Sequence, residues 1–525
     1  MSNPFKSIAI SLSGGGYRAT AFHLGALSYL NQVDYEGTTL LQNVKLISTI
    51  SGGTFTGVSY VLTLAKGNDF KSCFDKLYHL LQEDQLVIEA LQMVNATSKW
   101  KAQDKNKDLI NAFSEIYQAK FCDNEHFSLL LGANNLGHLD EFCFNATDLY
   151  NTLPFRFQKT GKIGNGKMNI PKAAAAEIRL GDIMAASSCF PGGFEPLAFP
   201  RDFMREQNST LAQYWKDQKY PKDIALMDGG ILDNQGIESV MLEYNAGGKT
   251  IDTYIVSDVS TRNAQPFQFP ATKTPGLLGK MTYKDLRVLV AVIAVLGVVG
   301  MVVLWNSYQV LLILSALVTT FSSLVMLAFF MIFRAINRTI AQELGTEQET
   351  PAILKNLDIL EKTPLSILWH LIAVRLFSLG DILENTFMSR IRKLQVSSLY
   401  ENDIWKNIVI SNNVYSLFTD YKTAEGVAPP SPQILSTLQK AAKMPTSLWF
   451  TSEEKAEGML DNLIISGQIN LCFQILQYLI KKKNTFPPED LPALEVLYQT
   501  VLADYEHFIT DEKWLLQEIK APRIL

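Results

Sequence analysis

Three short stretches of the chain place glycine beside side chains that could carry out group-transfer chemistry. Residues 13–18 have the sequence SGGGYR, residues 51–53 have SGG, and residues 228–230 have DGG. Glycine lets a ligand approach the backbone closely and leaves N–H groups that could bind an oxyanion. The serine hydroxyl could act as a nucleophile, and the aspartate carboxylate could accept its proton.

The glycine-rich stretch by itself allows three interpretations. Gly14, Gly16 and Ala19 satisfy the loose dinucleotide-binding pattern G-x-G-x-x-G/A, and Asp34 stands within range of the acid that binds the ribose. The same backbone N–H groups could instead form an oxyanion hole. The stretch could also be a plain tight turn.

The serine stretch favours the oxyanion hole. Ser51 follows an apolar run at residues 44–50 and precedes a helical pattern at residues 55–64, as the strand, turn and helix of a nucleophile elbow require. A dinucleotide site has no use for this serine. The usual elbow pattern G-x-S-x-G begins with glycine where this chain has Thr49, and a serine in such a turn could also be only a helix N-cap.

Asp228 stands directly after a third apolar run, at residues 225–227. This order places its carboxylate at the edge of a sheet where substrates bind in α/β folds, although an isolated Asp-Gly-Gly is more often a plain turn. The chain has six histidines, and only His370 and His507 follow Asp228, both in helical segments. A Ser-His-Asp triad in the chain order of ordinary α/β hydrolases therefore has no good candidate.

These turns need a common sheet to bring them together. Strand-like residues 7–12 and 44–50, each followed by a turn and a helical pattern, predict a parallel sheet with helices on its faces, which is an α/β fold. Further strand-like runs lie at residues 142–145, 225–227, 252–256 and 407–411. The chain from about residue 434 onward predicts helices.

A long uncharged stretch interrupts this fold. Residues 288–333 contain no charged side chain and exceed the ~20 apolar residues that one membrane crossing needs, which predicts a helical hairpin with its turn at residues 305–308. Basic residues flank both ends and place them on the cytoplasmic side: Lys284, Arg287, Arg334 and Arg338. A buried helical pair in a soluble domain is the alternative.

The hairpin divides the chain into three parts. We expect a catalytic region at residues 1–275, a transmembrane hairpin at residues 276–345, and a continuation of the α/β domain with a helical C-terminal region at residues 346–525. The catalytic part then lies in the cytoplasm beside a multi-pass anchor of two helices. Uncharged polar residues such as Ser315 and Thr319 predict that the second helix contacts a neighbour, and the transmembrane helices could join copies of the chain into a homo-oligomer.

Composition excludes several other classes. The chain has 47 Lys and Arg against 52 Asp and Glu, a formal charge of -5, so the broad basic surface of a nucleic-acid-binding protein is not expected. The five cysteines form no CxxC pair, and no calcium loop of the D-x-D-x-D-G type occurs. We therefore expect no metal ion and no other cofactor.

In their order along the chain, the three glycine-containing stretches resemble the patatin-like phospholipases. The resemblance covers roughly residues 5–258, resumes weakly at residues 444–470, and implies a patatin-like sheet flanked by helices. Three further blocks carry it, FHLG at residues 22–25, NATD at 145–148 and IMAASSCFP at 183–191. The departures from the family pattern are Thr49 at the elbow, Ala19 in place of a glycine, and Gln235-Gly236 after Asn234.

The resemblance also implies roles for individual residues. Ser51 is similar to the family's nucleophile, and Asp228 to the aspartate of its Ser-Asp dyad, which needs no histidine. The glycine loop is similar to the oxyanion loop, whose donors would here come from Gly14, Gly15, Gly16 and Gly52. Arg18 could hold a phosphate head group, although it could also be only a surface charge.

Combined with the hairpin, these features predict a membrane-anchored serine acyl hydrolase. Its partners would be the lipid bilayer and a phospholipid or related lipid ester that lies in it. Two alternatives stay open. One is a catalytically silent patatin-fold scaffold, for which Thr49 is the only support, and the other is a dinucleotide-binding membrane protein.

Overall fold

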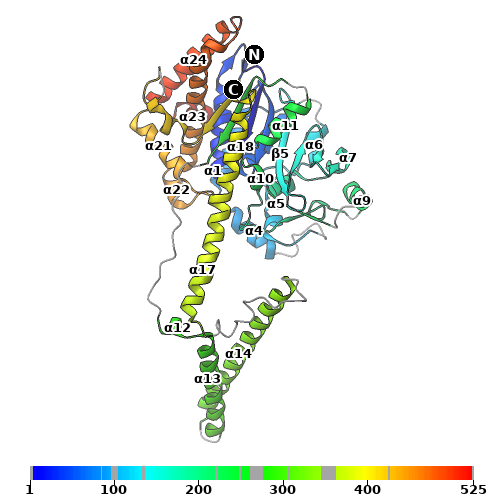
Figure 1. Cartoon of the computed structure of the whole chain (residues 1–525), viewed down its shortest axis with the longest axis vertical. Helices are drawn as coiled ribbons and strands as arrows, with labels where there is room; N and C mark the ends of the chain where they lie inside the picture. The colour runs from blue at the N-terminus through cyan, green and yellow to red at the C-terminus, as the bar shows by residue number, and fades with distance from the viewer. Residues whose placement is uncertain are drawn as a thin grey trace. The chain divides into compact units, whose positions relative to one another are not determined.

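The structure is a computed structural model of the whole chain, drawn in Figure 1. It describes residues 4–522, apart from residues 84, 96–104, 133–135, 207, 219–222, 248–249, 261–275, 306–307, 344–361 and 424–425. The chain divides into two compact units. The first comprises residues 1–264 and 384–525, and the second comprises residues 265–383.

The first unit is built on a mixed sheet of ten strands. Five of them run parallel in the order β12 (Val409–Asn413), β11 (Thr253–Asp258), β1 (Ile8–Leu12), β4 (Val44–Ile50) and β5 (Glu141–Asp148). The rest pair antiparallel: β6 (Leu153–Gln158), β7 (Ile163–Gly164), β8 (Asn169–Ile170), β9 (Leu197–Phe199) and β10 (Ile224–Asp228). The expected strand at residues 407–411 is thus β12, two residues further along.

Strand β5 determines how the two catalytic candidates meet. β4 runs parallel along it and ends where Ile50 pairs with Asn145. β10 runs antiparallel along it and ends where Asp228 pairs with Ala146, the next residue. Because β4 and β10 approach from opposite directions, their carboxyl ends meet, and the turns that follow them lie side by side.

The helices α1 (Gly16–Gln32) and α2 (Gly52–Ala65) directly follow β1 and β4. α1 is buried from Gly16 to Leu30 because the C-terminal helix α23 (Met459–Lys482) packs against it. The two backbones touch at glycines, since a Cβ on Gly25 would lie 2.0 Å from the Ile464 carbonyl oxygen and one on Gly467 would lie 2.0 Å from that of Phe22. Figure 1 shows the C-terminal helices α21 (Pro432–Lys443), α23 and α24 (Leu491–Thr510) gathered beside α1.

The remaining elements of the first unit surround this core. They are β2 (Asp34–Tyr35), β3 (Thr38–Thr39), α3 (Phe70–Gln82), α4 (Leu86–Asn95), α5 (Leu109–Lys120), α6 (Phe127–Gly132), α7 (Lys172–Ala175), α8 (Leu180–Ser188), α9 (Thr210–Asp217), α10 (Gly230–Asp233), α11 (Ile237–Gly247), α18 (Met388–Glu401), α19 (Trp405–Ile408), α20 (Ser416–Asp420), α22 (Ser452–Ala456) and α25 (Trp514–Lys520).

The second unit consists of helices: α12 (Leu277–Lys280), α13 (Tyr283–Leu304), α14 (Gln309–Glu343) and α17 (Leu365–Asp381). α13 and the part of α14 from Gln309 to Leu327 are long and apolar enough to cross a membrane. The expected turn includes residues 306–307, which lie outside the described residues, as do the side chains of Arg334 and Arg338.

Small residues form the contact between α13 and α14. A Cβ on Gly297 would lie 2.3 Å from Thr319 Oγ1, and one on Gly300 would lie 2.7 Å from Ser315 Oγ. The apolar side chains beside them point outward, and Leu296 is 63% exposed. Small and hydroxyl-bearing residues between two helices with apolar outer faces are typical of packing in lipid.

Candidate active site

Ser51 occupies a backbone conformation that L-residues seldom adopt, with φ 48° and ψ -118° at the junction of β4 and α2. The residues after it must be glycine, because the two turns touch. A Cβ on Gly52 would lie 2.2 Å from the Gly16 carbonyl oxygen, and one on Gly53 would lie 2.3 Å from that of Leu12. A strained serine between a strand and a helix is the geometry of a nucleophile elbow.

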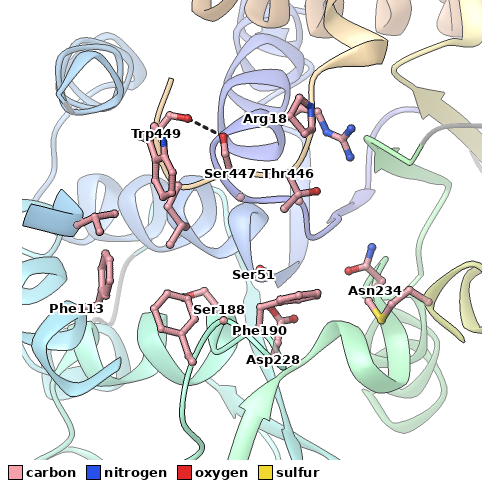
Figure 2. A pocket seen from close by; sticks show the side chains of 18 of the residues that line it. Arg18, Ser51, Phe113, Ser188, Phe190, Asp228, Asn234, Thr446, Ser447 and Trp449 are labelled. Atoms are coloured by element: carbon pink, nitrogen blue, oxygen red, sulfur yellow. Dashed lines mark hydrogen bonds between the residues drawn. The ribbon is translucent and has the colours of Figure 1, made fainter. Parts of the chain in front are cut away.

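Asp228 is the carboxylate that the sheet brings into the same pocket as this serine. Its Oδ1 accepts from the Gly230 N–H at 2.7 Å. Burial raises the pKa of Asp228 to about 6, although the Gly230 N–H and the Ser51 side chain both act to lower it. Figure 2 shows the two side chains close together in one pocket.

The glycine loop offers fewer free donors than its sequence predicts. The Gly14 N–H donates to the Asn234 carbonyl at 3.0 Å and is therefore not free to bind an oxyanion in this structure. Gly15 and Gly16 have φ angles of 145° and 60°, and none of the described carbonyls accepts from their N–H groups. Gly52 begins α2 and touches Gly16, so the free N–H groups of the two turns converge.

A chain of hydrogen-bonded hydroxyl groups holds the backbone of the turn at Ser51. The Ser51 N–H donates to Ser187 Oγ at 3.0 Å, Ser187 Oγ lies 2.7 Å from Thr54 Oγ1, and that atom lies 2.9 Å from Thr49 Oγ1. The methyl group of Thr49 fits because residue 57 is glycine, where a Cβ would lie 2.4 Å from Thr49 Cγ2. Gly57 therefore leaves room for Thr49, which stands where the elbow pattern has glycine.

Arg18 lies in the wall of the pocket and is only 7% exposed, so it is not a surface charge. Its Nη1 donates to the Met444 carbonyl at 2.6 Å, while its buried Nε has no partner. Burial and the nearby Arg392 lower the pKa of Arg18 to about 10. Arg392 lines the same pocket, and its two N–H groups reach the Asn234 side-chain oxygen at 2.6 and 2.8 Å when that amide is oriented to accept them.

His23 supports the glycine loop and does not reach Ser51. Its Nε2 lies 3.0 Å from the Ser13 carbonyl oxygen, and its Nδ1 lies 3.0 Å from Ser257 Oγ. Complete burial lowers the pKa of His23 to about 4, so the ring is neutral. It holds the start of the loop in place.

Asp34, the acid of the dinucleotide hypothesis, lies beyond the carboxyl end of α1, exposed in β2. The glycine loop lies at the other end of this helix, about 25 Å away at 1.5 Å per residue. Within the described ranges, no cluster of three His, Cys, Asp or Glu side chains could hold a metal ion.

The pocket has a volume of about 530 Å³ and an apolar side that no motif predicted. Figure 2 shows Phe113 and Trp449 on one side of Ser51, and Arg18 and Asn234 on the other. Its apolar lining comes from Val87, Leu109, Phe113, Phe190, Phe194, Met388, Leu448 and Trp449.

The C-terminal residues 445–449 form part of the pocket wall and hold the glycine loop opposite them. The Ser447 carbonyl accepts from the Tyr17 N–H at 2.8 Å, and a Cβ on Gly16 would lie 2.2 Å from the same oxygen. Residues from both ends of the chain therefore build the site.

The sequence of residues 10–241 matches the family model for patatin-like phospholipase. None of the curated proteins matches the chain. Among solved structures, human GIVD cytosolic phospholipase A2 aligns at 13% identity and a TM-score of 0.34, over 49% of this chain and 43% of that one. Its complex with methyl gamma-linolenyl fluorophosphonate aligns at 12% identity and a TM-score of 0.41, over 95% and 60%. VipD from Legionella pneumophila aligns at 11% identity and a TM-score of 0.28, over 99% and 81%.

Proposed function

We propose, starting from the patatin-like phospholipase domain that residues 10–241 form, that this lipid hydrolase releases fatty acids from phospholipids or related lipid esters through an acyl-enzyme on Ser51. One observation carries the proposal. The carboxyl ends of β4 and β10 meet on β5 and bring the Ser51 hydroxyl and the buried Asp228 carboxylate into one pocket.

The reaction would proceed in two steps. Asp228 accepts the hydroxyl proton while Ser51 Oγ attacks the acyl carbonyl, and the departing alcohol takes that proton as the acyl-enzyme forms. Water then attacks the carbonyl of the acyl-enzyme and gives a proton to Asp228. Asp228 passes this proton to Ser51 Oγ as the fatty acid leaves. A carboxylate with a pKa of about 6 is ionised at neutral pH and is a stronger base than an exposed aspartate.

The backbone around Ser51 would stabilise the charge that develops on the carbonyl oxygen. The free N–H groups of Gly15, Gly16 and Gly52 are the donors that suit this role. The apolar side of the pocket would take the acyl chain, and Arg18 would hold an anionic head group on the other side.

The hairpin of α13 and α14 would anchor the enzyme in the membrane that contains its substrate. Both helices have the length and apolarity of membrane spans, and their inner contact uses small residues. Because the hairpin would cross the membrane twice, both parts of the catalytic unit would lie on the same side. Lys284 and Arg287 before α13 indicate that this is the cytoplasmic side. Assembly into a homo-oligomer through these helices stays a prediction.

The test uses the purified full chain with a fluorophosphonate probe and with phospholipid vesicles. Ser51→Ala should abolish both labelling and fatty-acid release, and Asp228→Asn should lower both by about 10³-fold or more. Ser59→Ala is the matched control, since Ser59 is a buried serine on the same helix, two turns from the site. Labelling and release that persist in Ser51→Ala would refute the nucleophile. A folded wild type that does neither would favour the silent scaffold.

A further inference from the structure

The side chain of Asn234 lies beside the two catalytic candidates. Asn234 follows α10 directly, is only 3% exposed, and lines the same pocket as Ser51 and Asp228 (Figure 2). Its backbone carbonyl accepts from the Gly14 N–H, which holds the residue against the glycine loop. A buried amide side chain requires hydrogen-bond partners, so the direction in which its oxygen and nitrogen point matters for the site.

Arg392 determines which way this amide points. Its Nη2 and Nε lie 2.6 and 2.8 Å from one end of the Asn234 amide. A guanidinium group only donates hydrogen bonds, so this end must be the oxygen. The opposite end faces only hydrogen-bond acceptors, as the nitrogen Nδ2 requires. The chemistry of Arg392 therefore assigns the orientation of the amide.

Arg392 is itself held in place. It belongs to α18, which packs against α10. Burial acts to raise the pKa of Asp258, but the nearby charge of Arg392 and hydrogen bonds to the carboxylate keep this pKa below its usual value. Asp258 is therefore ionised and offsets part of the guanidinium charge. Both contacts favour a fixed arginine that orients Asn234 over a free one that binds a head group.

The Nδ2 end of the amide points toward the place where the proposed reaction occurs. A Cβ on Gly14 would lie 2.5 Å from this end and 3.1 Å from Ser51 Cβ. A Cβ on Gly230 would lie 2.4 Å from this end and 3.0 Å from Asp228 Oδ1. The amide nitrogen therefore borders both Ser51 and Asp228, and it has room there because residues 14 and 230 are glycines.

Asn234 occupies one donor of the glycine loop and offers another. The Gly14 N–H is bound to the Asn234 carbonyl and is not free for an oxyanion. The Nδ2 group carries two hydrogens and lies against the same glycine. Side-chain amides are among the groups that form oxyanion holes in acyl-transfer enzymes. The side chain of Asn234 can thus take the place of the backbone donor that its carbonyl removes.

We propose that Asn234 is a further oxyanion donor of this enzyme, and that Arg392 is the positioning residue that turns its Nδ2 toward the carbonyl attacked by Ser51. The inference rests on the proposed acyl-enzyme and adds two residues to its mechanism. α18 comes after the second unit in the chain, so the site depends on a helix that lies beyond the apolar hairpin in the sequence.

The experiment measures kcat and KM of the purified full chain on two substrates, phospholipid vesicles and a p-nitrophenyl ester of a short fatty acid. The second substrate has no phosphate head group. Asn234→Leu has a similar shape and no donor, so kcat should fall about 10²–10³-fold on both substrates with little change in KM. Thermal unfolding of each variant checks that it is folded.

Arg392→Met should lower kcat about tenfold on both substrates, because the amide is then free to turn. Arg392→Lys keeps a donor for the Asn234 oxygen and should recover part of this loss. Arg390→Met is the matched control, since Arg390 is exposed on the same helix and should change neither constant.

The double variant of Asn234→Leu and Arg392→Met separates a positioning role from an independent one. It should be no slower than Asn234→Leu alone, because Arg392 acts only through the amide. Effects that multiply would overturn the role of Arg392. A rise in KM on phospholipid alone would also overturn it, since that result marks a contact with the head group.

Asn234→Asp keeps an oxygen for Arg392 and removes the donor, so it tests the proposal even if Asn234→Leu does not fold. Its kcat should also fall at least about 10²-fold. A folded Asn234→Leu or Asn234→Asp with near wild-type kcat would overturn the proposal. Ser51→Ala, measured in parallel, keeps the two proposals apart. If Ser51→Ala is inactive while Asn234→Leu is not impaired, only the oxyanion donor fails, whereas an active Ser51→Ala refutes the acyl-enzyme itself.

Discussion

The two strand, turn and helix units at the site share one architecture and offer different chemistry. In β1, its loop and α1, the chain turns through Gly15 and Gly16, both with positive φ, and exposes backbone N–H groups. In β4, its turn and α2, the positive φ belongs to Ser51, which exposes a hydroxyl instead. The residue type at the position with positive φ therefore decides whether such a unit exposes only amide groups or also a hydroxyl group.

The two units also differ in the contacts that stabilise their turns. The loop after β1 depends on distant segments, since the Ser447 carbonyl binds the Tyr17 N–H. The turn after β4 depends on its own neighbourhood, since Thr49 and Thr54 lead to Ser187 beneath Ser51. In the proposed mechanism the amide unit uses no charge, whereas the hydroxyl unit uses the buried carboxylate of Asp228 as its base.

After loss of Ser51 or Asp228 themselves, the largest effect is expected from Gly16→Ala in the amide unit. The new Cβ would lie 2.2 Å from the Ser447 carbonyl oxygen, at a φ of +60°, so the loop and its N–H groups must move. Loss of oxyanion donors should lower kcat about 10²–10³-fold. Gly67→Ala is the control, because Gly67 has a φ of +71° and open space around it. Near wild-type turnover by Gly16→Ala would show that this loop does not hold the oxyanion.

A second experiment tests the proposed base, Asp228, through the pH dependence of the labelling rate. With a pKa of about 6 for Asp228, the rate of fluorophosphonate labelling should fall about tenfold per pH unit below pH 6 and level off above it. A pH-independent rate between pH 5 and 8 would contradict the role of the carboxylate as base.

The same pKa makes a prediction about stability. Because the folded-state pKa of this carboxyl is raised, its contribution to stability is present below about pH 4 and is lost as the pH rises through 6. Asp228→Asn should therefore raise the free energy of unfolding by roughly 2–3 kcal/mol at pH 8 and change it little at pH 4, while activity is lost. Calorimetric scans at both pH values measure the difference, and an equal shift at both would contradict the cause.

The local support of the hydroxyl unit can be tested by a double-mutant cycle. Gly57→Ala should destabilise the fold by about 1–3 kcal/mol, because its Cβ would lie 2.4 Å from Thr49 Cγ2. Thr49→Gly removes that methyl group, so the double variant should recover most of the loss. Additive effects of the two changes would mean that Thr49 and Gly57 do not compensate each other.

The local elements of the fold could be predicted from the sequence, and the pairing of distant ones could not. The expected strand at residues 44–50 is β4 residue for residue, because an apolar run that ends in a glycine turn is a local signal. Nothing local revealed that β10 runs antiparallel against β5, which is what brings Asp228 to Ser51. The occupied N–H of Gly14 and the pocket wall at residues 445–449 could not be predicted for the same reason, because each depends on a contact between residues hundreds of positions apart. The apolar composition of α23 is misleading in a similar way. It is typical of a membrane-spanning helix, but α23 lies buried in the core.

The smallest effect is expected at Ser187, where the hydroxyl chain meets the elbow. Ser187→Ala leaves the buried Ser51 N–H without its acceptor at 3.0 Å, which should cost about 1 kcal/mol and slow acylation about fivefold. KM and the pH profile should not change, because neither the pocket lining nor Asp228 is altered. Thr54→Val breaks the chain one bond further from Ser51 and should slow acylation less. If Ser187→Ala labels at the wild-type rate, the close contacts of Gly52 and Gly53 hold Ser51 in its strained conformation without help. The hydroxyl unit would then depend on backbone packing just as the amide unit does, and the contrast between their supports would vanish.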